Sequence, residues 1–168
     1  MKEIFNRRSI RKFEDRPIEK EKIDKIIRAA MQAPSAANQQ PWEFIVVENK
    51  ESLKALALTT PYSKPIESSA VTIVLLGNSD YLKIPTGWQQ DMGAVAQNIL
   101  LESVYLELGA VWLGVATSDV AIESVKKTYQ LPDNIMPFAM IAIGYPDGQK
   151  NELVDRYIES RVHYEKWA

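Results

Sequence analysis

The sequence predicts one domain of the α+β or α/β class. Its 168 residues are within the usual size of a single domain. Hydrophobic residues make up 46% of the chain and charged residues 25%, which is enough apolar material for a core. Segments with helical spacing of apolar side chains alternate with short apolar runs that are typical of strands. No repeat, low-complexity tract or long linker divides the chain, so we expect residues 1–168 to form a single domain.

The first half of the chain contains five predicted segments. Met1–Arg8 is expected to form a short helix, and Asp15–Ile18 a turn around its proline. From Glu19 onward, apolar residues recur at helical spacing, and this helix is expected to end before Pro34. The run "WEFIVVE" predicts a strand over Trp42–Glu48, which is followed by a helix over Lys50–Thr59.

The second half begins with an expected buried strand over Ala70–Gly77 ("AVTIVLLG"). Asn78–Trp88 mixes Gly, Pro, Asn and Asp, which indicates a loop. Gln89–Leu108 is the longest helical stretch, and Gly109 is a plausible stop for it.

A short strand ("AVWLGVA") then precedes a helix that Ser118 or Asp119 could cap. That helix is expected to reach about Gln130, and Phe138–Tyr145 is a further buried strand. Residues 151–168 are polar and aromatic with no core of their own, so we expect this tail to dock on a partner subunit.

Composition excludes several classes of site. A net charge of −2 argues against a general binder of nucleic acid. The absence of cysteine excludes disulfides, thiolate catalysis, cysteine-ligated zinc and iron–sulfur clusters. With His163 as the single histidine, a histidine-rich metal site is impossible and a Ser-His-Asp triad is disfavoured, so no metal is expected. Neither a signal peptide nor a membrane span is indicated, and the expected location is the cytoplasm.

The segment "RRSIRKF" places four cations in seven residues. If the first nine residues are helical, Arg7 and Arg11 are neighbours one turn apart, and Arg8 lies close to both. Guanidinium groups at this spacing repel one another unless an anion lies among them, and the Ser9 hydroxyl adds a neutral donor for phosphate. The alternative is a solvated face whose cations pair with Glu3, Glu14 and Asp15.

Two further segments have the character of binding sites. "APSAANQQPW" (33–42) brackets small and amide residues between two prolines, and its Ser35, Asn38 and Gln40 could serve a planar heteroaromatic ring. A well-made connection between helix and strand is the alternative. "GAVWLGV" (109–115) contains a glycine inside a strand, which often marks close approach of a ligand but also occurs in ordinary core strands.

Taken in order, these segments resemble the nitroreductase-like family of flavoproteins. The motifs are "RRSIRKF", "APSAANQQPW", "WQQDMGAVAQNILLESVYLELGAVWLG" and "SRVHYEKW", and together they span essentially the whole chain. The resemblance implies an α+β fold with a mostly antiparallel sheet flanked by helices. It also implies an intertwined homodimer with an exchanged C-terminal extension and FMN at the subunit interface.

The resemblance also implies roles for individual residues. Arg7 and Ser9 would bind the FMN phosphate with Arg8 nearby, and Arg11 would face the N1/O2 edge of the flavin. The backbone of Leu113 and Gly114 would lie near N5. Four residues would come from the opposite subunit: Pro34, Ser35, Ala36 and Asn38. In the tail, Arg156 resembles a further phosphate cation, with Arg161 as the alternative.

The activity implied is hydride transfer from NADH or NADPH through flavin N5 to a nitroaromatic, quinone or similar acceptor in a ping-pong cycle. Arg11 would stabilise the negative charge that develops at N1 and O2, so no general base is needed. The alternatives are a related flavoenzyme, acting in dehalogenation or flavin fragmentation, and a non-catalytic flavin-binding dimer.

Four further residues have expected roles outside these motif assignments. The resemblance implies that larger members of the family have a helical insertion before the central helix, where this chain has only the loop 78–88, so Tyr81 and Trp88 could line the substrate pocket or anchor the loop. His163 is expected to be structural. Asp91 is expected to cap the central helix, with an ion pair to the arginine cluster as the alternative.

Overall fold

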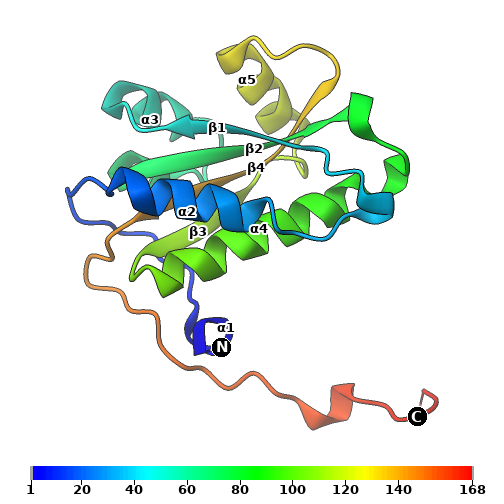
Figure 1. The fold of residues 1–168 in the computed structure, drawn as a ribbon. Helices are drawn as coiled ribbons and strands as arrows, with labels where there is room; N and C mark the ends of the chain where they lie inside the picture. The colour runs from blue at the N-terminus through cyan, green and yellow to red at the C-terminus, as the bar shows by residue number, and fades with distance from the viewer. Residues whose placement is uncertain (1, 168) are drawn as a thin grey trace.

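The computed structural model describes residues 2–167, which form a three-layer arrangement of helices around one sheet (Figure 1). The strands are β1 (Trp42–Val47), β2 (Val71–Asn78), β3 (Gly109–Gly114) and β4 (Ile135–Gly144). The helices are α1 (Lys2–Asn6), α2 (Lys20–Ala30), α3 (Lys50–Leu56), α4 (Trp88–Tyr105) and α5 (Asp119–Tyr129).

The sheet has the strand order β1-β2-β4-β3, and every neighbouring pair is antiparallel. This confirms the expected α+β fold with an antiparallel sheet. All eight residues of β2 are buried, because β2 is a central strand with helices on both faces. Burial on both faces explains why its sequence is a continuous apolar run rather than an alternating one.

Two apolar cores lie on opposite faces of the sheet. Successive side chains of a strand point to opposite faces, so Ile73 and Leu75 join one core while Val74 and Leu76 join the other. Helices α2 and α4 cover the first face, and α3 and α5 cover the second. The long helix α4 contributes the most to the first core, through residues 92, 95, 96, 99 and 100.

Several expected boundaries need correction. Helix α1 ends at Asn6 rather than at Arg8. The central helix ends at Tyr105, and the chain reverses at Glu107, whose φ of 64° is left-handed, so Gly109 is not the stop. Strand β4 begins at Ile135, three residues before the expected start, because these residues pair with the end of β2. The expected cap of α5 is confirmed: the Ser118 side chain accepts from the Ala121 amide.

The C-terminal tail runs away from the three layers in a largely extended form (Figure 1). It contributes no residue to either core, and Tyr145 is the last buried side chain in the described chain. Large apolar side chains along the tail are exposed, namely Leu153, Val154, Tyr157, Ile158, Val162, Tyr164 and Trp167.

Gly109 allows the N-terminal segment to lie directly against the start of β3. A Cβ atom at this position would lie 2.6 Å from Ile10 Cγ2 and 2.7 Å from Ile10 Cβ. Because Ile10 is buried, its main chain would have to shift, and we expect Gly109→Ala to lower the free energy of unfolding by ~1–3 kcal/mol. Denaturant unfolding measures this change.

Gly93→Ala is the matched control. Gly93 is inside α4, and the nearest neighbour of an added Cβ is Trp112 Cη2 at 3.9 Å. Because alanine favours a helix over glycine, this variant should equal or exceed the wild type in stability. Equal stabilities for the two alanine variants would contradict the assigned role of Gly109.

Candidate functional site

The segment Arg7–Phe13 is extended and lies along the edge of the sheet beside β3. The Ile10 amide donates to the Ala110 carbonyl at 3.1 Å, and Ser9 forms a parallel bridge with Ala110. The expectation that Arg7 and Arg11 are neighbours on a helix is therefore wrong. In extended backbone alternate residues share a side, which separates Ser9 and Arg11 from the buried Ile10.

Two side-chain amides from the start of the tail fix this segment. Gln149 Oε1 accepts from the backbone amides of Arg11, at 2.6 Å, and Lys12, at 3.1 Å. Asn151 Oδ1 accepts from the Arg8 amide at 3.1 Å, while its Nδ2 donates to the Leu108 carbonyl at 3.0 Å. Sequence reasoning missed both residues, because a side-chain contact across some 140 residues leaves no local pattern.

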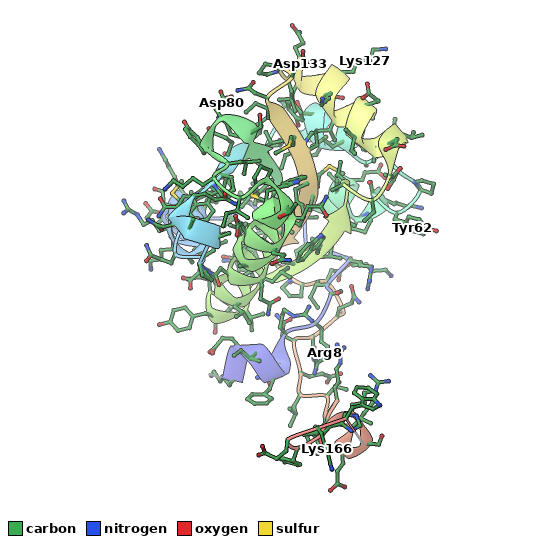
Figure 2. The ribbon with its side chains drawn as sticks, turned by 90° about the vertical axis from the view of Figure 1, so that its right-hand side faces the viewer. Arg8, Tyr62, Asp80, Lys127, Asp133 and Lys166 are labelled. Atoms are coloured by element: carbon green, nitrogen blue, oxygen red, sulfur yellow. The ribbon has the colours of Figure 1, made fainter. Side chains whose placement is uncertain are left out.

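A polar cavity of about 590 Å³ lies where the segment Arg7–Phe13, called the basic segment below, meets the tail. Figure 2 shows Arg8 at this place, where the N-terminal segment and the tail run side by side. Cations outnumber anions in the lining, which includes Arg8, Ser9, Arg11, Lys150, Glu152 and Arg156. Such a lining suits an anion, and Lys150 is an addition that the sequence motifs did not indicate.

Arg156 also borders a second cavity of about 730 Å³, between α1 and the tail, where it is joined by Arg7. Burial, together with the positive charges of Arg156 and Arg8, lowers the pKa of Arg7 from its ordinary value. An anion among these groups would relieve that repulsion. Arg161 lines neither cavity, so the geometry favours Arg156 as the tail cation.

The Arg8 guanidinium lies against the end of α1. It donates through Nη2 to the Phe5 carbonyl at 2.9 Å and through Nη1 to the Arg7 carbonyl. Among the described residues, its Nε is one of two buried side-chain polar atoms that have no hydrogen-bond partner. A buried guanidinium donor without a partner is costly, and a bound anion would supply the missing acceptor.

A third cavity, of about 610 Å³, has a largely apolar lining and shares Arg11 with the polar cavity. Leu113 and Gly114 at the end of β3 line it, together with Trp112. Arg11 thus lies where a polar space meets an apolar one. Its Nη1 donates to the Ser9 carbonyl at 3.3 Å, which orients the guanidinium.

Residues 60–62, 64 and 65 also line this third cavity, and the sequence motifs did not include them. Lys64 adds a second cation to the lining of the cavity. Tyr62 also lines it, although its side chain is 82% exposed to solvent (Figure 2). Lys64 and Pro65 are the first two residues of a short 3₁₀ helix, and a proline in this place is typical of an ordinary helix start. The sequence around it therefore carried no signal of a site.

The loop 33–41 lies away from the basic cluster within one chain. It contacts the beginning of α4, through Ala36, whereas the basic segment pairs with Ala110, which lies beyond the other end of α4. An 18-residue helix spans ~27 Å, so Pro34, Ser35, Ala36 and Asn38 are not joined with Arg7 and Arg156 in this chain.

Asp91 does not cap α4, and that expectation is wrong. The N-cap residue is Gly87, and both carboxylate oxygens of Asp91 point to the loop instead. They accept from the Ala36 amide at 2.9 Å and from Gln39 Nε2 at 2.5 Å.

The three ring side chains singled out from the sequence, Trp88, Tyr81 and His163, all lie outside the third cavity. Trp88 packs edge-on against Phe138, with ring centroids 5.9 Å apart, as an anchor at the start of α4. Tyr81 is about half exposed, and neither residue lines the cavity at Leu113 and Gly114. His163 stacks on Trp167 in the tail.

Within residues 2–167, no group of three or more His, Cys, Asp or Glu residues could hold a metal ion. The helices of this part of the chain are too short or too polar to cross a membrane.

Comparison with known proteins agrees with this geometry. The model of the nitroreductase family matches residues 4–64 and 62–145. A Methanothermobacter thermautotrophicus protein named "Putative NADH dehydrogenase/NAD(P)H nitroreductase" is 41% identical over 98% of this chain and 85% of its own length.

Solved structures give the same result. A "Putative NADH Oxidase" from Clostridium acetobutylicum is 47% identical, with a TM-score of 0.97 over 98% of this chain and 99% of its own. An FMN-dependent nitroreductase from Clostridium difficile R20291 is 30% identical, with a TM-score of 0.90 over 99% of this chain and all of its own. By the family model and by these similarities, this chain belongs to the nitroreductase family.

Proposed function

We propose that this protein is an NAD(P)H-dependent FMN oxidoreductase that reduces nitroaromatic, quinone or similar acceptors. The observation that carries the proposal is the pair of cavities that meet at Arg11. One is polar and rich in cations, as a phosphate requires, and the other is largely apolar, as a flavin ring requires. The family, and the names of its members, supply the cofactor and the hydride donor.

The residues fit FMN at both ends. Arg7, Arg8, Ser9 and Arg156 would hold the phosphate, which would accept from the buried Arg8 Nε and relieve the repulsion between Arg7 and Arg156. At the other end, the backbone of Leu113 and Gly114 would lie against the ring. Gly114 is exposed and has no side chain, so a ring could approach the main chain closely.

The proposed site is shared by two subunits. Pro34, Ser35, Ala36 and Asn38 are separated from the basic cluster of their own chain, so they would complete the site of the partner. The exposed apolar side chains of the tail would be covered in the same homodimer.

When bound, FMN supplies hydride transfer at its N5 atom, first from the nicotinamide and then to the acceptor. The protein supplies position and charge. Arg11, held by Gln149 and the Ser9 carbonyl, would place a fixed positive charge at the N1/O2 edge, where negative charge develops. No side chain has to move a proton for this role.

The test is purification followed by anaerobic titration with NADH and with NADPH. We expect a yellow protein whose flavin absorbance one of the two nicotinamides bleaches, and which an added nitroaromatic or quinone restores. Flavin that neither nicotinamide reduces would overturn the reductase proposal, and so would a protein that does not take up FMN.

Replacing Arg11 with alanine tests the electrostatic role separately. We expect Arg11→Ala to lower the flavin reduction potential and to slow reduction by NAD(P)H by roughly 10–100-fold, since a charge fixed at the reacting group is lost. Binding of FMN should weaken less than reduction slows. Potentiometric and stopped-flow measurements check this, and an unchanged potential would show that Arg11 is not at the N1/O2 edge.

A further inference from the structure

A buried carboxylate links the central helix to the loop 33–41. Asp91, in the first turn of α4, is only 4% exposed. Its Oδ1 accepts from the Ala36 amide at 2.9 Å, and its Oδ2 accepts from Gln39 Nε2 at 2.5 Å. Two N–H donors thus compensate the burial of this charge, and both belong to the loop.

The side chain of Gln39 joins the loop to a second segment, residues 83 and 84. It is 5% exposed, and its Oε1 accepts from the backbone amides of Lys83 and Ile84, each at 2.9 Å. Its Nε2, besides the bond to Asp91, also contacts the Ile84 carbonyl at 3.4 Å. The side-chain amide therefore has a fixed orientation, with the donor toward Asp91 and the acceptor toward residues 83 and 84.

The loop needs such support because its backbone is unfavourable. Ala37, Asn38 and Gln40 have φ values of 49°, 52° and 48°, in the left-handed region that side chains other than glycine rarely adopt. Three such residues within four positions persist only if surrounding contacts over-determine the conformation. Asp91 and Gln39 provide buried contacts on both sides of Ala37.

We infer that Asp91 and Gln39 are positioning residues, which hold the loop 33–41 in the shape that flavin binding requires in the partner subunit's site. The inference rests on the proposed function, which assigns Ser35, Ala36 and Asn38 to the partner's flavin. Asp91 acts through the Ala36 amide and through Gln39, and it does not touch the flavin itself.

The donor and acceptor pattern permits a compensating pair of substitutions. In Asp91→Asn, the new amide can still accept from Ala36, but its NH₂ faces the NH₂ of Gln39. A flip of the Gln39 amide would only move the mismatch to the amides of Lys83 and Ile84. Adding Gln39→Glu gives one oxygen to the new NH₂ and leaves the other for those two amides.

We therefore expect each single variant to weaken FMN binding about tenfold or more: Asp91→Asn loses a buried hydrogen bond, and Gln39→Glu sets a second buried carboxylate against that of Asp91. The double variant should bind FMN within about threefold of the wild type, and the double-mutant cycle isolates this coupling. Flavin fluorescence titration measures the Kd, and thermal melting of the apoprotein shows that each variant is folded. A double variant that binds FMN no better than the single variants would overturn the inference that Asp91 and Gln39 position the loop.

Mixed dimers test whether the loop acts on the partner's site. A protomer with Asp91→Asn and one with Arg7→Ala, carrying different affinity tags, are coexpressed and purified together. If the loop serves the partner, one of the two sites combines an intact Arg7 with an intact loop, and the mixed dimer binds one FMN with wild-type affinity. If the loop serves its own chain, both sites are defective and no tight FMN is bound, which would overturn the inference.

The wild type separates this result from the proposed function. A wild-type protein that binds and reduces FMN while the mixed dimer has no tight site overturns the positioning inference alone. A wild type that binds no FMN overturns the proposed function and the inference with it.

Discussion

Replacing Arg7 with alanine should raise the Kd for FMN by roughly 10–100-fold, because a hydrogen-bonded contact to a charged group contributes ~1.5–3 kcal/mol. Burial, and then the positive charges of Arg156 and Arg8, lower the pKa of Arg7 from its ordinary value, so its charge is already unfavourable without an anion. The phosphate would be the anion that compensates these charges, so its binding energy depends on them. Fluorescence titration of the apoprotein with FMN measures the change.

Lys12→Ala is the matched control for this prediction. It removes a cation from the same segment, but Lys12 is exposed and lines neither of the cavities that contain Arg156. We expect its Kd for FMN to stay within about twofold of the wild type, since exposed charges interact weakly. Equal losses in the two variants would mean that overall charge, rather than a phosphate contact at Arg7, governs binding.

Deleting residues 152–168 should give a monomer that binds FMN roughly 100-fold more weakly or worse. The deletion removes Arg156, worth ~1.5–3 kcal/mol by itself. It also removes the exposed apolar side chains that the proposed dimer would cover, and with the dimer the partner's loop would be lost. Light scattering after gel filtration measures the mass, and fluorescence titration measures the Kd.

The body of the protein should survive this deletion, because both cores are complete by Tyr145 and the bracing Gln149 and Asn151 are retained. Arg156→Ala in the full chain separates the two roles of the tail: it should stay dimeric and lose only the phosphate contact. A truncated chain that remains dimeric, with native FMN affinity, would contradict both the proposed exchange of the tail and the role of Arg156.

The fold was largely predictable because its signals are local. The apolar run at β2 and the helical spacing over α2 each reflect one element and the face it buries. The boundaries that failed have non-local causes. β4 begins early because it pairs with the end of β2, and α4 ends early because the chain must turn at Glu107 to place β3 at the edge of the sheet.

The candidate site could be proposed from the sequence by residue type, but its geometry could not. The sequence shows that Arg7, Ser9 and Arg11 have the chemistry to bind an anion, but it suggested a helix as their support. The structure instead places them on extended backbone, because Ile10 is buried beside Gly109 and the side-chain amide of Gln149 binds the main chain.

By itself, then, the sequence determined most helices and strands, the residue types of the candidate site and the resemblance to a family, since each of these depends on local periodicity or on short motifs. Only the tertiary structure decided that Arg156 comes to lie beside Arg7, that Arg11 lies where the polar and apolar cavities meet, and that Asp91 serves the loop rather than its own helix. The physical reason is that these contacts join residues some 50 to 150 positions apart. Packing of the sheet against its helices brings such residues together, and no pattern in a local stretch of sequence records it.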